Sequence, residues 1–114
     1  MLWTMHYLTL DGVMADPHMW HPTYAGEDAY ALTRAHIEEA GAADSVMVAG
    51  SGRLVRALLA AGLVDEMRLT VDPLVRGHGL RLLPDGVPSV ELELVDQRSL
   101  SNGVQYLAYR PVAA

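Results

Sequence analysis

A turn of four small residues is the first feature of the sequence that could do chemistry. Ala49, Gly50, Ser51 and Gly52 follow a short apolar run and precede a segment with helical periodicity. Small side chains let the backbone approach a phosphate closely, and the N–H groups and dipole at the start of a helix attract an anion. The turn is therefore a candidate site for the pyrophosphate of a dinucleotide. The alternative is a tight strand-to-helix connection with no ligand.

A second group of candidates lies in residues 11–24, where polar and aromatic side chains follow neither helical nor strand periodicity, so we expect a loop. Histidine titrates near neutral pH, and aromatic rings can wall an apolar pocket. The candidates for catalysis are His18 and His21, and those for substrate binding are Asp11, Asp16, Trp20 and Tyr24. The alternative is a surface loop whose aromatic residues pack over a small core.

The spacing of His18 and His21 would suit two metal ligands on one side of a helix. Pro17 and Pro22 argue against a helix, and no clear third ligand lies near in the sequence. We therefore expect no metal site.

Two further acid–base candidates lie outside that segment. Asp28 falls in the first turn of a predicted helix, and His78 lies between two glycines. A solvated first-turn carboxylate and a turn histidine explain them equally well. His6 is expected to be a packed or edge histidine of a strand, and His36 a hydrogen-bonded histidine of a helix.

The periodicity predicts one α/β domain over residues 1–114, with a mixed sheet, about two helices and a C-terminal β-hairpin. The expected strands are residues 2–10, 45–49, 67–72, 90–95 and 104–109, and the expected helices are 26–40 and 52–61. Ser101-Asn102-Gly103 is the hairpin signal.

Composition excludes several classes of function. The 114 residues include no cysteine, which excludes disulfides and thiolate catalysis. All eight basic residues are scattered arginines and the net charge is −6, so we expect no nucleic-acid partner. The lack of lysine excludes Schiff-base chemistry. No apolar run is long enough to cross a membrane, so we expect a cytoplasmic protein without a membrane partner.

Residues 48–84, "VAGSGRLVRALLAAGLVDEMRLTVDPLVRGHGLRLLP", and 92–111, "LELVDQRSLSNGVQYLAYRP", resemble the dihydrofolate reductase-like superfamily. "LTLDGVMA", residues 8–15, is similar to the family's first strand and its following loop. The nearest branch is the C-terminal reductase domain of bacterial riboflavin deaminase-reductases. The resemblance implies a dihydrofolate reductase-like sheet and binding of NADPH, with the pyrophosphate at residues 49–52.

The sequence departs from that family in three places. Thr9 replaces a usual serine, and Asp72 stands where histidine is usual. The family's central segment, which holds the adenosine end and 2′-phosphate of NADPH, is absent between residues 40 and 48. The resemblance thus implies a truncated domain whose cofactor is in doubt.

Three functions remain open, and the first is favoured. It is acid–base chemistry, such as isomerisation, cyclisation, elimination or hydrolysis, on an apolar small-molecule substrate without NADPH. The second is an NADPH-dependent reductase of a carbonyl or imine-like substrate, with the nicotinamide near residues 11–16. The third is a non-catalytic ligand-binding module. Each implies a homodimer, because loss of the central strands leaves a sheet edge open.

Overall fold

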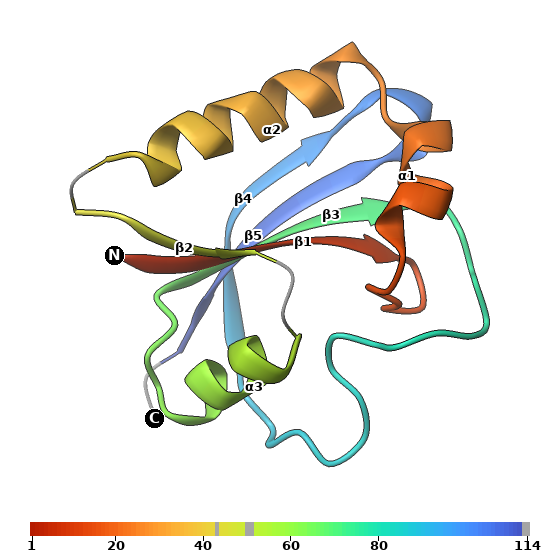
Figure 1. Ribbon diagram of the computed structural model, residues 1–114. Helices are drawn as coiled ribbons and strands as arrows, with labels where there is room; N and C mark the ends of the chain where they lie inside the picture. The colour runs from red at the N-terminus through yellow and green to blue at the C-terminus, as the bar shows by residue number, and fades with distance from the viewer. Residues whose placement is uncertain (43, 50–51, 113–114) are drawn as a thin grey trace.

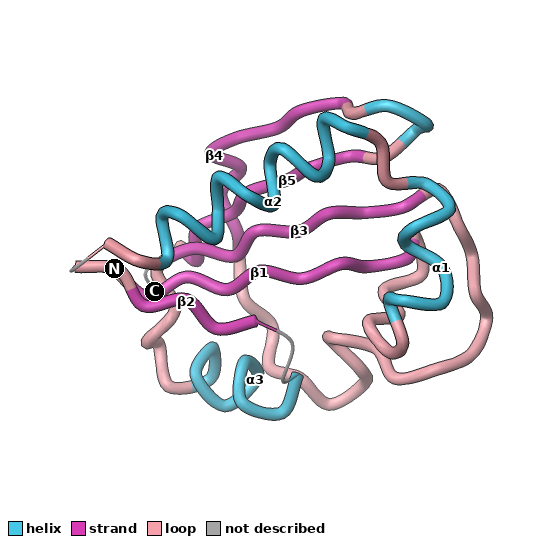
Figure 2. The backbone as a smooth tube through the Cα atoms, turned by 45° about the horizontal axis from the view of Figure 1, so that its top comes forward, coloured by secondary structure: helices cyan, strands magenta, loops and turns pink. Residues whose placement is uncertain are grey.

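The sheet is the centre of the molecule and carries helices on both of its faces (Figures 1 and 2). The computed structural model describes residues 1–42, 44–49 and 52–112. The elements in these residues are β1 (Leu2–Thr9), α1 (Pro17–Tyr24), α2 (Glu27–Ala40), β2 (Val46–Ala49), α3 (Gly52–Ala60), β3 (Glu66–Asp72), β4 (Leu92–Ser99), the 3-10 turn η1 (Ser101–Gly103) and β5 (Gln105–Pro111). The expected α/β domain with a mixed sheet and a C-terminal hairpin is confirmed.

The strand order is β2-β1-β3-β5-β4. β1 is parallel to β2 and β3, and β5 is antiparallel to β3 and β4. The pairing of β1 with β2 ends at Met5 and Ala49, whereas the pairing of β1 with β3 continues to Thr9 and Asp72. The second half of β1 therefore extends beyond its pairing with β2, on the side where α3 begins.

Alternation along the strands gives the two faces different chemistry. On the α3 face, Leu8, Val55, Leu59 and Met67 belong to the buried apolar core. On the α2 face the sheet presents aromatic and charged groups, and the ring of Trp3 lies edge-on to His36 of α2 at 5.8 Å. Figure 2 shows the two helices on opposite sides of the sheet.

The structure corrects the expected loop over residues 11–24 and the expected number of helices. Residues 17–24 form α1, so the described residues contain three α-helices rather than about two. Pro17 is accommodated because a helix needs no N–H bond in its first turn, and Pro22 interrupts the bonding of only a short helix. Trp20 is buried and its Nε1 donates to the carbonyl oxygen of Ala15 at 3.1 Å, which anchors the helix.

Two apolar residues of the helices are exposed. Ile37 is 57% exposed, because His36 takes the buried position and consecutive helical residues lie about 100° apart. Leu54 is 46% exposed, and its neighbour Val55 is fully buried.

The hairpin strand β4 also differs from its expected range of 90–95. It spans Leu92–Ser99, and a register shift between Leu94 and Asp96 breaks the alternation on which the expected range depended. The turn itself forms as expected, with Asn102 at φ 64 in the left-handed region.

Candidate functional site

A histidine–carboxylate pair lies at the carboxyl ends of β1 and β3, where α1 packs against the sheet (Figure 1). His21 Nδ1 and Asp72 Oδ2 are 2.7 Å apart. The Asp72 side chain is fully buried and that of His21 is 12% exposed. An ionised carboxylate only accepts hydrogen bonds, so Nδ1 is the donor and Nε2 is the ring atom left to exchange a proton.

Aromatic contacts hold the His21 ring in this position. It stacks on Tyr7 of β1 with ring centroids 4.3 Å apart and lies edge-on to Trp20 at 6.3 Å. The Tyr7 hydroxyl is hydrogen-bonded to Thr33 Oγ1 of α2 at 2.8 Å. Asp72 Oδ1 has no partner in the part of the chain that the structure describes. The pair is thus fixed by packing and has unused hydrogen-bonding capacity.

A cleft of about 280 Å³ opens beside this pair, where β1 extends past β2. Its lining residues come from β1, the loop after it, the start of α1 and the end of β2: Met5, His6, Tyr7, Met14, Pro17 and Ala49. Tyr7 is shared, because it lines the cleft and its ring stacks on His21. Crevices at the carboxyl ends of parallel strands are the usual ligand sites of open α/β sheets.

The cleft adjoins the small-residue turn. Ala49 lines it, and a Cβ added to Gly52 would lie 2.8 Å from the Sδ atom of Met14, another lining residue. The first residue of α3 is therefore packed against the cleft wall. Gly50 and Ser51, the other two predicted pyrophosphate-binding residues, lie outside the described residues. A larger cavity of about 650 Å³ near Leu59 and Pro111 contains none of the described candidate residues.

Two of the predicted carboxylates bind the chain itself. Asp11 accepts hydrogen bonds from the Thr9 hydroxyl and from the N–H groups of Gly77 and Arg76, and in that order these bonds hold its pKa far below the usual range. Asp28 Oδ2 accepts from the N–H of Ser101 at 2.8 Å, which lowers the pKa of Asp28. Both carboxylates tie distant loops together.

The remaining predicted residues form no side-chain hydrogen bond or ion pair with His21 or Asp72 in the described part of the chain. His18 and Asp16 are exposed, and exposed His78 contacts the carbonyl oxygen of Arg76 at 3.0 Å through Nδ1. The Tyr24 carbonyl oxygen accepts a hydrogen bond from Asn102. Although α1 places His18 and His21 on a helix, the described residues hold no group of three potential His, Cys, Asp or Glu metal ligands.

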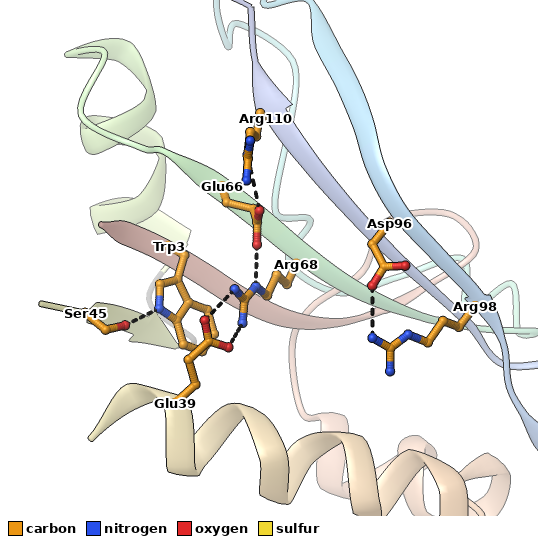
Figure 3. A network of polar contacts seen from close by, with 8 residues as sticks. All are labelled: Trp3, Glu39, Ser45, Glu66, Arg68, Asp96, Arg98 and Arg110. Atoms are coloured by element: carbon orange, nitrogen blue, oxygen red, sulfur yellow. Dashed lines mark hydrogen bonds and ion pairs between the residues drawn. The ribbon is translucent and has the colours of Figure 1, made fainter. Parts of the chain in front are cut away.

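A charged network on the α2 face was not foreseen from the sequence (Figure 3). Arg68 donates from Nε to Glu66 and from Nη1 to Glu39, both at 2.6 Å, and its guanidinium lies 3.9 Å from the centre of the Trp3 ring. Burial opposes the charge of Arg68, but the hydrogen bonds to Glu39 and Glu66 outweigh it and raise its pKa. The sequence feature that could have predicted this network is the polar residue at every second position of β3, from Glu66 to Asp72.

Comparisons with known proteins agree with this architecture. Residues 35–106 match the family model of the RibD C-terminal domain. A putative riboflavin biosynthesis protein from Shewanella sp. PV-4 superimposes with a TM-score of 0.70 at 14% identity, over 98% of this chain and 99% of that chain. The riboflavin biosynthesis reductase Rib7 of Saccharomyces cerevisiae gives a TM-score of 0.62 at 13% identity, over 98% and 88% of the two chains. At these identities the likeness concerns the fold.

A curated relative shares more sequence over a shorter stretch. The uncharacterized protein YyaP of Bacillus subtilis is 37% identical over 60 residues, which are 53% of this chain and 32% of that protein. The match therefore spans about a third of the relative's length. In the described residues no helix is long and apolar enough to cross a membrane. The family match spans well over half of the sequence and confirms the resemblance noted above: the chain belongs to the RibD C-terminal domain family.

Proposed function

We propose that the protein is an NADPH-dependent reductase of a small carbonyl or imine-like substrate, with the nicotinamide end of the cofactor bound in the cleft between β1 and the start of α3. The observation that carries the proposal is the cleft itself, at the carboxyl ends of parallel strands and against the first residue of α3 in a RibD C-terminal domain. Family membership favours this function over the redox-independent one that the truncated sequence suggested.

The residues present fit one end of the cofactor. Pockets for drug-sized ligands measure roughly 300–1,000 Å³, so a cleft of about 280 Å³ suits a single-ring head group. Met5 and Met14 provide apolar contact with a ring. The adenosine end of the cofactor has no strand beyond β2 to contact, because β2 is the edge of the described part of the sheet. We therefore expect modest affinity, supplied mainly by the nicotinamide and pyrophosphate.

Bound NADPH would supply a hydride to the substrate, and the chain would supply the proton. His21 is the candidate donor because Asp72 fixes its Nδ1 and leaves Nε2 to exchange a proton. Tyr7 stacks on His21 and also lines the cleft, so it connects the His21–Asp72 pair with the proposed ligand site. Asp72 acts as a positioning residue for His21.

The second candidate function is the acid–base chemistry without cofactor. The same His21–Asp72 pair beside a largely apolar cleft favours it, because a histidine held by a buried carboxylate can serve isomerisation or elimination equally well. Binding of NADPH distinguishes the two functions.

The test is a calorimetric titration of NADPH into the wild-type protein and two variants of β2. Ala49→Phe fills the cleft, whereas Val46→Phe adds the same ring at the other end of the strand, where Val46 is 57% exposed. We expect micromolar to submillimolar binding that Ala49→Phe abolishes and Val46→Phe leaves intact. Absence of wild-type binding at millimolar NADPH would overturn the proposal and leave the second candidate.

A further inference from the structure

A second groove lies on the α2 face of the sheet, between α2 and the hairpin of β4 and β5. This groove, here called the α2 groove, has a volume of about 320 Å³. No described residue lines both the α2 groove and the cleft beside the His21–Asp72 pair, so the two sites are separate. The charged side chains of the α2 groove, all drawn in Figure 3, are Glu39, Glu66, Arg68, Asp96, Arg98 and Arg110.

Two buried polar side chains without partners also line the α2 groove. His36 of α2 is 8% exposed and Tyr106 of β5 is 3% exposed, and neither side chain is hydrogen-bonded to a described residue. The unpartnered polar atoms that are sealed from solvent in the described chain belong to Thr4, His6 and Asp72. Those of His36 and Tyr106 are not among them, so they open to the groove. Buried polar groups nearly always have a partner, which here must be a water, an ion or a ligand.

The hydrogen-bonding capacity left unused in the α2 groove consists mainly of donors. Glu39 uses both carboxylate oxygens on Arg68, and Glu66 uses one on Arg68 and the other on Arg110. Arg98 and Arg110 each pair with one carboxylate, at 3.1 and 3.4 Å, although a guanidinium carries five N–H groups. The open hydroxyl and imidazole add further donors. A ligand that fills the groove is therefore expected to be rich in acceptors.

We propose that the α2 groove binds a small oxyanion, a carboxylate or a phosphate, against Arg98, Tyr106 and His36. The guanidinium carbon of Arg98 lies 5.7 Å from the centre of the Tyr106 ring, and the His36 ring lies 5.3 Å from the same centre. The side chains of Arg98 and its partner Asp96 are 56% and 42% exposed, so this pair can open without leaving a buried charge. A guanidinium binds carboxylates and phosphates through paired hydrogen bonds. The inference is independent of the proposed reductase function.

The test is an NMR titration of the protein labelled with ¹³C at the ζ carbon of its five tyrosines. The resonance of Tyr106, assigned by its absence in Tyr106→Phe, is followed during addition of inorganic phosphate and of acetate, with chloride at equal ionic strength as the reference. Arg98→Met removes the guanidinium, and Arg98→Lys retains the charge. Arg34→Met is the matched control, because Arg34 is exposed on α2 and does not line the groove. Ala49→Phe fills the separate cleft.

We expect a saturable shift of the Tyr106 resonance with an oxyanion and none with chloride. Saturation by phosphate alone identifies a phosphate site, and saturation by acetate identifies a carboxylate site. Arg98→Met should weaken binding at least about tenfold, since hydrogen bonds to charged groups are the stronger class, and Arg98→Lys should restore part of the loss. Arg34→Met and Ala49→Phe should bind as the wild type does.

Two results would overturn the inference. The first is a Tyr106 resonance that does not move, or that moves equally with chloride, which would leave water as the partner of the buried groups. The second is a shift that persists in Arg98→Met and disappears in Ala49→Phe, which would place the anion in the cleft. Circular dichroism checks that each variant is folded.

Discussion

Burial of neutral His6 should make the stability of the protein depend on pH between 6.5 and 4.5. The pKa of His6 falls from 6.5 to about 4 on folding, because burial disfavours the charged ring. The unfolded chain then binds more protons than the folded one in this interval, so the free energy of unfolding decreases as the pH falls. Since one pKa unit corresponds to about 1.4 kcal/mol, acidification from pH 7 to 4.5 should remove about 2–3 kcal/mol through His6.

The assay is urea denaturation of the wild type and of His6→Gln at pH 7 and at pH 4.5. Glutamine does not titrate, so the variant should lose about 2–3 kcal/mol less than the wild type over this interval. The pKa of His36 is also lowered, by burial first and by Arg68 second, but His36 contributes to both proteins and cancels in the comparison. Equal losses in the two proteins would refute the assignment of a buried neutral ring to His6.

Three further predictions concern the charged network, the histidine pair and the cofactor. Arg68→Met leaves Glu66 buried and should lower the free energy of unfolding, measured by chemical denaturation, by about 3–5 kcal/mol. The double variant Arg68→Met with Glu66→Met should lower that free energy by less, and a larger loss in the double variant would contradict this. Asp72→Asn should lower kcat at least tenfold in a reductase assay while circular dichroism stays unchanged, because an amide can donate as well as accept and no longer fixes the ring of His21 through Nδ1; an unchanged kcat would remove the pair from catalysis. NADH and NADPH should bind within about threefold of each other in calorimetry, since no described element lies beyond β2 to hold the 2′-phosphate; strong preference for NADPH would point to a phosphate site elsewhere.

The open edge of the sheet gives one more prediction. β2 is an edge strand among the described residues, and its Val46 is 57% exposed. The sequence led us to expect a homodimer but did not indicate how it forms, and we propose that a second copy of the chain pairs with this edge. Sedimentation should give a dimer that Val46→Lys weakens, and a wild-type monomer at micromolar concentration would contradict the proposal.

Periodicity predicted the sheet and two of the helices because those elements bury one face over many residues. The apolar positions of β1, β3 and α3 repeat with the period of their element, and each element forms close to its expected range. The pattern failed for α1, where two prolines obscure a helix that tertiary burial of Trp20 stabilises. It failed for the end of β4, which continues to Ser99, because a register shift between Leu94 and Asp96 interrupts the alternation.

The site was less accessible to sequence reasoning because it depends on contacts between distant segments. His21 was a candidate, but its partner Asp72 is 51 residues away and was noted only as a departure from the family pattern. The two meet because β3 pairs with β1 and because α1 packs over their carboxyl ends. His6 was expected to be a packed or edge histidine, and only three-dimensional geometry shows that it is buried with no partner for its ring nitrogens among the described residues.

The most direct test of the central claim is to locate the nicotinamide ring by NMR on protein labelled with ¹³C at the methionine methyl groups. The six methionines include Met5 and Met14 in the cleft, together with exposed Met19 and buried Met67 outside it. We expect nuclear Overhauser effects between the nicotinamide protons of NADPH and the methyl groups of Met5 and Met14, and none to Met19 or Met67. Effects confined to Met19, or none at saturating NADPH, would contradict a nicotinamide site between β1 and α3.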